Sequence, residues 1–184
     1  MRQLFVFLIL IFYGLSSSAE ELDRRIAVVC SGCHGSNGAS KGDFIPIIGG
    51  QTREYLKEAM EDFKNGKRQG SVMPNLAKGY TKEGVKYLAQ FFSSQPWSST
   101  KTPFDKKFLE KGEKISGECS GCHGKYGFGG EEYPRIAGQP VLYLKQALLE
   151  YKNKNRNNDE MSFVESYKDD QLEALANYYS SIRK

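Results

Sequence analysis

The sequence predicts an all-α fold made of two tandem domains, and three observations support this. The pattern Cys-x-x-Cys-His occurs twice, at residues 30–34 and 119–123. Other features recur at nearly the same distance: Pro46 and Pro134, like Met73 and Met161, are 88 residues apart, which indicates a duplicated unit. Between these features, apolar side chains recur every three or four residues, as is typical of amphipathic helices.

The repeated motif is the pattern of covalent c-type haem attachment. Each thiol adds across one vinyl group of the porphyrin, and the two intervening residues let both sulfurs reach the ring. The histidine that follows is then placed under the iron as its proximal ligand. The chain has four cysteines and two histidines, and the two motifs use all of them. We therefore predict two haem c groups, attached through Cys30, Cys33, Cys119 and Cys122 and ligated by His34 and His123.

A zinc site shared between the motifs is the alternative, because the same six residues would supply four ligands. Counting alone does not exclude it. The methionines favour haem, since both histidines are already assigned to the proximal side and a thioether remains as the second axial ligand.

Apart from Met1, the chain has three methionines, and two of them are predicted to bind iron. Met60 falls on the apolar face of its expected helix and is assigned to the core. Met73 and Met161 lie 39 and 38 residues after the histidines of their motifs, in segments expected to be loops. We assign them as axial ligands. The alternative is that both are loop methionines that fill gaps in packing.

Two prolines are expected to support the histidines. A ligating histidine normally donates its second ring N–H to a carbonyl or carboxylate. Pro46 and Pro134 follow His34 and His123 by 12 and 11 residues. The resemblance of these loops to those of c-type cytochromes, where a proline carbonyl after the motif has this role, implies the same role for their carbonyls. Alternatively, each proline only shapes its loop.

Residues 1–19 resemble a secretory signal, with a short positive start, an apolar run from Leu4 to Leu15 and small residues before Glu20. The run is short for a membrane span, so we expect cleavage and no stable membrane insertion afterwards. An uncleaved anchor is the alternative. Attachment of haem c takes place outside the cytoplasm, and this predicts a periplasmic protein.

The helical pattern places one domain at residues 20–98 and the other at 99–184. Helices are expected at 21–29 and 104–115, each running into a haem motif. Thr52 and Thr81 are expected to cap helices, the first ending at Asn65 and Gly66. Pro140 is expected as the first residue of a further helix, and a last helix carries the apolar residues Leu172, Leu175, Ala176 and Tyr179.

We expect no nucleic-acid partner, because the small positive net charge of the chain gives no sign of one. The chain has 26 basic and 22 acidic residues, and the propionates of two haems would roughly cancel the excess. The basic side chains are scattered along the expected helices, as on a solvated face.

The tandem layout resembles that of the two-domain, di-haem class I cytochromes c over the whole mature chain. The free electron carriers of the c-four type share the Pro-x-Ile-x-Gly-Gln loop at residues 46–51 and the Leu-Ala-x-Tyr-Tyr sequence at residues 175–179. The cytochrome subunit of flavocytochrome c sulfide dehydrogenase is similar at residues 63–66, 77–80 and 99–105. Of the two groups, we favour the sulfide dehydrogenase subunit.

The resemblance implies that each domain wraps around one covalently bound haem and that the protein transfers single electrons without catalytic residues of its own. As a sulfide dehydrogenase subunit, it would accept electrons from an FAD-containing flavoprotein and pass them to a small cytochrome or a terminal oxidase. As a free carrier, it would deliver electrons to a terminal oxidase. A di-haem peroxidase is a third class, but it needs a displaceable iron ligand and a much longer chain.

Overall fold

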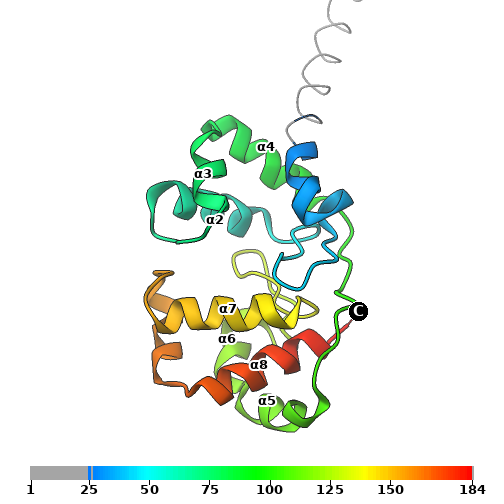
Figure 1. The fold of residues 1–184 in the computed structure, drawn as a ribbon, viewed down its shortest axis with the longest axis vertical. Helices are drawn as coiled ribbons and strands as arrows, with labels where there is room; N and C mark the ends of the chain where they lie inside the picture. The colour runs from blue at the N-terminus through cyan, green and yellow to red at the C-terminus, as the bar shows by residue number, and fades with distance from the viewer. Residues whose placement is uncertain (1–24, 26, 184) are drawn as a thin grey trace, which may run out of the picture.

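The computed structural model describes residue 25 and residues 27–183 (Figure 1). These residues form helices and loops without a β-strand, and the only β-type pairing among them is an isolated bridge between Arg68 and Arg156. The predicted all-α class is therefore confirmed. The expected signal lies outside the described residues, and within them no helix is both long and apolar enough to cross a membrane.

The first half, residues 25–98, is drawn in blue to green in Figure 1. Residues 27–34 form a helix that contains the first haem motif. Three helices follow: α2 (Arg53–Asn65), α3 (Met73–Lys78) and α4 (Lys82–Ser93), with α2 packed against both others. The core of this half is centred on Ala27, Leu88 and Phe92.

Two threonines and one glycine define the ends of these helices. The side chain of Thr52 accepts a hydrogen bond from the Tyr55 N–H, and that of Thr81 accepts one from the Gly84 N–H, so both predicted caps are confirmed. Helix α2 ends where Gly66 adopts a φ of 76°, a conformation that glycine adopts without strain.

The second half, residues 99–183, repeats this plan below the first in Figure 1. Its elements are η2 (Lys106–Phe108), α5 (Leu109–Ile115), α6 (Gly117–His123), α7 (Val141–Lys152), η3 (Asp159–Ser166) and α8 (Asp169–Ser181). Helix α8 packs against α5 and α7. The core of this half is centred on Cys119, Leu144, Leu175, Ala176 and Tyr179. This confirms the inward face expected for the last helix.

Two expected helix boundaries in this half are wrong. The helix expected at 104–115 is a 3₁₀ turn followed by α5, and the turn begins after Asp105, whose carboxylate accepts the Lys107 N–H. Pro140 immediately precedes α7 instead of beginning it, since its ψ of 139° is extended. Both shifts are small and leave the apolar faces in place.

Gly112 allows α5 and α8 to cross closely. A Cβ atom at this position would lie 2.3 Å from the carbonyl oxygen of Ala174 and 2.5 Å from the Tyr178 side chain. Only glycine fits without displacing a backbone. This contact holds the helix before the second haem motif against the last helix of the chain.

The two halves face each other through a contact that is nearly two-fold symmetric. The Gln69 N–H donates to the Asn155 carbonyl, and the Asn157 N–H donates to the Lys67 carbonyl, both at 3.0 Å. Gln69 and Asn157 are 88 residues apart in the sequence, as are Lys67 and Asn155. Each half therefore presents the same patch to the other, as in the isologous interface of a homodimer.

Candidate functional site

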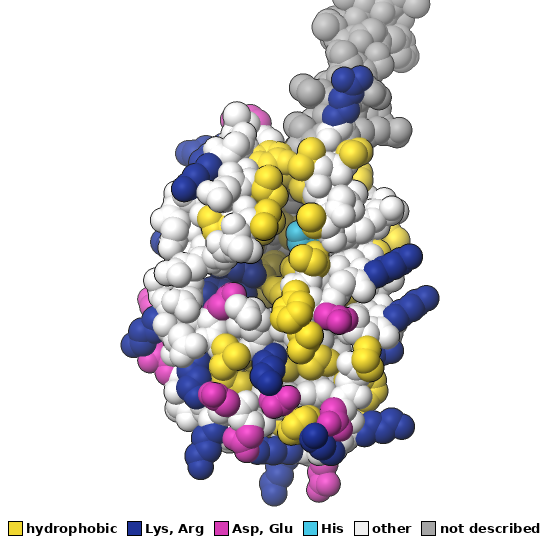
Figure 2. Space-filling model, in the orientation of Figure 1, with side chains coloured by type: hydrophobic (Ala, Val, Ile, Leu, Met, Phe, Trp, Pro, Cys, Tyr) yellow, Lys and Arg dark blue, Asp and Glu magenta, His cyan; other side chains and the backbone are white. Residues whose placement is uncertain are grey.

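The first motif presents its residues from the helix at 27–34. Cys30 is half-buried, Cys33 is exposed and His34 is buried. Nδ1 of His34 lies 2.8 Å from the carbonyl oxygen of Pro46, so the predicted proline contact is confirmed. In Figure 2, a histidine side chain is visible in a hollow surrounded by hydrophobic side chains in the upper half.

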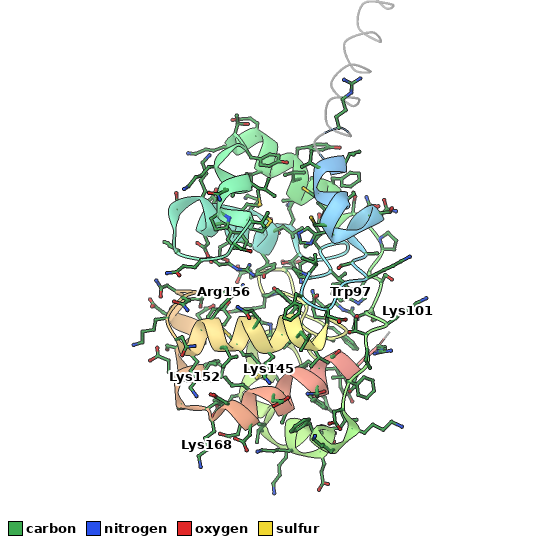
Figure 3. The ribbon with its side chains drawn as sticks, in the orientation of Figure 1. Trp97, Lys101, Lys145, Lys152, Arg156 and Lys168 are labelled. Carbon is green, nitrogen blue, oxygen red and sulfur yellow. The ribbon has the colours of Figure 1, made fainter. Side chains whose placement is uncertain are left out.

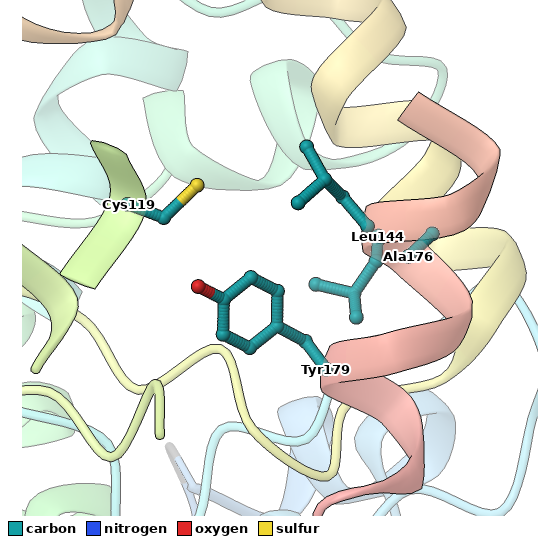
Figure 4. Packing of buried hydrophobic residues seen from close by; sticks show 5 residues of the cluster. Cys119, Leu144, Ala176 and Tyr179 are labelled. Atoms are coloured by element: carbon teal, nitrogen blue, oxygen red, sulfur yellow. The ribbon is translucent and has the colours of Figure 1, made fainter. Parts of the chain in front are cut away.

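The second motif repeats this geometry in α6. Cys119 and His123 are buried and Cys122 is exposed. Nδ1 of His123 lies 2.8 Å from the carbonyl oxygen of Pro134, again as predicted. Figure 4 shows the Cys119 sulfur and the Tyr179 hydroxyl facing the same space beside α8.

Burial prepares both histidines to bind a metal. It lowers the pKa of His34 and of His123, although the proline carbonyls oppose this effect, and the positive charges of Arg68 and Arg156, respectively, add to it. The imidazoles are therefore neutral at neutral pH. With Nδ1–H donating to a carbonyl, Nε2 keeps the lone pair that would ligate iron.

A cavity of about 260 Å³ joins the predicted residues of the second site. Cys119, Cys122, His123 and Met161 all line it. Residues of the first half, including Tyr55 and Asp62, form part of its wall. The structure thus brings together all four second-site residues at the boundary between the halves.

Both predicted methionine ligands are half-buried, but the expectation that they lie in loops is wrong. Met73 is the first residue of α3, whose start tolerates Pro74 because early helix positions need no backbone donor. Met161 lies in η3, where the Asn158 side chain caps the turn by accepting from the Met161 N–H. Met60 packs against the core of the first half, as expected.

Two buried arginines cross the boundary between the halves. Arg68 contacts the hydroxyl of Tyr143 at 3.5 Å, and Arg156 donates to the hydroxyl of Tyr55 at 3.0 Å. Both guanidinium groups also stack on aromatic rings of their own half. Figure 3 shows Arg156 at the level of this boundary.

These cations indicate that an anionic group fits here. Among residues 25 and 27–183, no ion pair involves Arg68, Arg135 or Arg156. Nε of Arg68 and Nη2 of Arg135 are buried without a hydrogen-bond partner. Burial disfavours ionisation of Tyr55, yet Arg156 and Arg68 lower its pKa to about 7. Buried charge requires a partner, and the carboxylate of a haem c propionate would supply one.

The sequence interpretation missed these arginines and tyrosines. The available signal was the repeat: Tyr55 and Tyr143, like Arg68 and Arg156, are 88 residues apart. The zinc alternative finds no support in the described part of the chain, which contains no group of three or more Cys, His, Asp or Glu residues placed to hold a metal ion.

Comparison with known proteins agrees with this geometry. The cytochrome c family model matches residues 109–183. The chain is 30% identical to cytochrome c4 of Pseudomonas aeruginosa over 159 residues, which are 79% of this chain and 78% of the relative. It is also 44% identical, over 75 residues, to the cytochrome subunit of sulfide dehydrogenase from Chlorobaculum tepidum; the match spans 41% of this chain and 67% of that subunit.

A solved structure shows the same fold over nearly the whole protein. Reduced cytochrome c4 from Pseudomonas stutzeri superposes with a TM-score of 0.80 at 25% identity, covering 89% of this chain and 98% of that one. Two haem motifs, a symmetric contact between halves and similarity over most of the chain lead to one conclusion. The chain belongs to the cytochrome c4 family of di-haem class I cytochromes c, which carry haem c and transfer electrons rather than catalyse reactions.

Proposed function

We propose that each half binds one haem c through its own motif and its own methionine. Cys30 and Cys33 attach the first haem, with His34 and Met73 as axial ligands. The second site uses Cys119, Cys122, His123 and Met161. The observation that carries this proposal is the cavity that all four second-site residues line, together with the equal 2.8 Å contacts of the two histidines.

The ligand set accounts for electron transfer without other chemistry. Haem iron with histidine and methionine on its two faces supplies a single-electron couple at raised potential. The protein excludes water from the buried histidines and fixes their ring orientation through Pro46 and Pro134. We assign residues 20–98 and 99–184 as the two domains, and residues 1–19 as the signal that directs the chain to the periplasm.

The partner we propose is the flavoprotein subunit of a sulfide dehydrogenase. The similarity to the Chlorobaculum tepidum subunit supports it, as does the contact between two of the stretches that resemble such subunits. The Lys64 ammonium, in the first stretch, donates to the Tyr80 carbonyl in the second at 2.7 Å. Tyr80 and Cys30 both pack against the core of the first half, so these stretches lie beside the first site.

The surface beside the first site also suits a bound partner. Five of the seven large hydrophobic side chains exposed among residues 25 and 27–183 lie in the first half. Three of these, Val29, Phe44 and Val72, define what we call the first rim, and each lies within two residues of Cys30, Pro46 or Met73. Exposed apolar side chains at these positions are available for contact with a partner.

A free carrier of the c4 type is the second candidate function. It is favoured by the extent of the similarity, because the match to the Pseudomonas aeruginosa protein covers most of both chains. Such a carrier would take electrons from one diffusing partner and deliver them to a terminal oxidase. It would form no lasting complex with a flavoprotein.

Rapid-mixing kinetics separates the two candidates. The purified, oxidised protein is mixed with low sulfide, alone and with the FAD-containing sulfide dehydrogenase subunit of the same organism. Fast haem reduction only with the flavoprotein, together with co-elution on gel filtration, supports the subunit function. Equal rates and no complex favour the free carrier.

Haem attachment is tested separately. Mass spectrometry of the denatured, acid–acetone-treated protein is expected to show two retained haem masses. One retained haem, or none, contradicts the proposed attachment at both motifs.

A further inference from the structure

Two buried glutamines each hold one backbone position in the opposite half. Gln51 donates from Nε2 to the Arg135 carbonyl at 2.9 Å, and its Oε1 accepts from the Arg135 N–H at 2.7 Å. Gln139 does the same to Ile47, at 2.8 Å and 2.9 Å. The glutamines are 3% and 2% exposed, so water does not compete for these bonds.

The clamped residues are the direct neighbours of the two histidine-binding prolines. Ile47 follows Pro46, whose carbonyl lies against His34. Arg135 follows Pro134, whose carbonyl lies against His123. Each glutamine therefore fixes the peptide that orients the histidine of the other half.

We propose that Gln51 is a positioning residue for the second haem and Gln139 for the first, so that each half sets the reduction potential of the other. The inference rests on the proposed ligation by His34 and His123. It adds that a residue of the opposite half, outside both haem motifs, influences the reduction potential of each haem.

The direction of the effect follows from the hydrogen bond to the histidine. A carbonyl held close to Nδ1–H makes the imidazole a stronger electron donor, which favours ferric iron. Releasing the clamp lets the proline carbonyl move away, so ferric iron loses stabilisation. The potential of the haem in the opposite half is therefore expected to rise.

The side chain of Arg135, whose backbone Gln51 holds, is itself fixed by two aromatic rings. Its guanidinium lies over the ring of Trp97, 4.5 Å from the centroid, and over Phe128 at 4.8 Å. Figure 3 shows Trp97 near the boundary between the halves. Ile47, the residue that the other glutamine holds, is 1% exposed. Both clamped peptides are thus fixed on their side-chain side as well.

The test uses the full-length holoprotein and the substitutions Gln51→Met and Gln139→Met, which keep side-chain volume and remove both hydrogen bonds. Redox titration followed by NMR resolves the two haems through the methyl signals of their methionine ligands, assigned with Met73→Ala and Met161→Ala. We expect Gln51→Met to raise the potential of the second haem and leave the first unchanged. Gln139→Met is expected to do the reverse. A three- to tenfold change in the reduction equilibrium is expected, tenfold being about 59 mV for one electron.

The crossed pattern distinguishes positioning from ordinary structural support. Each glutamine also lies at the start of a helix in its own half, and Gln51 accepts the Thr52 N–H there. A merely structural role would therefore change the haem of the same half, or both haems together, and either result overturns the proposal, as does no change at all. If one variant yields no holoprotein, the reciprocal variant alone gives the same decision.

A matched control is Gln146→Met, because Gln146 is exposed and bonds only Glu150 of its own helix. It should leave both potentials unchanged. The wild-type spectrum tests the underlying ligation independently: two methionine methyl signals support the proposed function whatever the glutamine variants do.

Discussion

The two halves are alike where they touch each other and different where they face the solvent. At the boundary, both repeats have the same glutamine, tyrosine and arginine. The first rim is apolar, with Val29, Phe44 and Val72 exposed by 58%, 62% and 55%. The equivalent positions of the second half, which we call the second rim, are Glu118, Glu132 and Glu160.

This difference shows which constraint acts at each position. A boundary residue must satisfy a partner that is itself a copy of the same unit, so its type is kept in both repeats. A rim residue has no such partner within the chain. The second rim lines the cavity of the second site and carries three carboxylates, whereas the first rim carries none, so charge distinguishes the two edges to an approaching protein.

The largest effect is expected from the methionines, and it tests whether the two sites are equivalent in ligation. Met73→Ala and Met161→Ala should each open one iron and lower that haem's potential on the order of 100 mV or more, since axial ligands set potentials over roughly 0.8 V. The weak near-infrared band of ferric methionine-ligated haem should halve in each variant. If neither substitution alters that band, Met60 or another ligand must replace the assignment.

The arginines test whether the two crossed contacts are equal in strength. Arg156→Met should lower the free energy of unfolding by about 2 kcal/mol, the value typical of a charged hydrogen bond. Arg68→Met should cost less, because its contact with Tyr143 is 3.5 Å compared with 3.0 Å for Arg156 and Tyr55. Guanidinium denaturation of the holoproteins measures both. Equal losses would contradict the difference in geometry.

The role of the two rims in guiding an electron acceptor is tested by the salt dependence of electron transfer. With a lysine-rich cytochrome as electron acceptor, neutralising the second rim by Glu118→Gln, Glu132→Gln and Glu160→Gln should slow electron transfer about tenfold at low ionic strength. The rate should also lose most of its salt dependence. The control replaces Val29, Phe44 and Val72 by glutamine and should leave the salt dependence unchanged. A steep salt dependence that survives in the first variant would show that charge at this edge does not guide the acceptor.

The smallest effect concerns helix capping, which differs between the halves. Thr52 caps α2 through its side chain, whereas Pro140, at the same position before α7, has no side-chain atom that can accept a hydrogen bond. Thr52→Ala should lower the free energy of unfolding by about 1 kcal/mol, measurable by thermal denaturation. Thr52→Ser keeps the hydroxyl oxygen that caps the helix and should change the free energy of unfolding less, and an equal loss in both variants would contradict the capping argument.

Local patterns were enough to predict the longer helices and the motif residues. The apolar spacing of α4 and α8, and the caps at Thr52 and Thr81, depend on residues close in the sequence, so they can be predicted without tertiary contacts. The four residues predicted for the second site all line one cavity; they are Cys119, Cys122, His123 and Met161. The short helical turns at Met73 and Met161 were not predicted, because they depend on caps and packing rather than on periodicity.

The boundary between the halves could not be predicted from local pattern. Gln51 and Gln139 read as the ends of loops, and Arg68 and Arg156 as solvated charges. Their partners are 75 to 101 residues away in the sequence. Only the shared spacing of the repeat marks them, and that spacing does not say which residues turn inward.

The crossed glutamines also impose an order on the assembly of the protein. A chain is made from its N-terminus, and domains tend to fold as they emerge. The first half can fold early, but Ile47 meets its clamp only after Gln139 has been made and docked. Gln51, by contrast, has already been made when the second half is synthesised. Both clamps close when the two halves dock, so the first site, which can fold earlier, stays unclamped for longer.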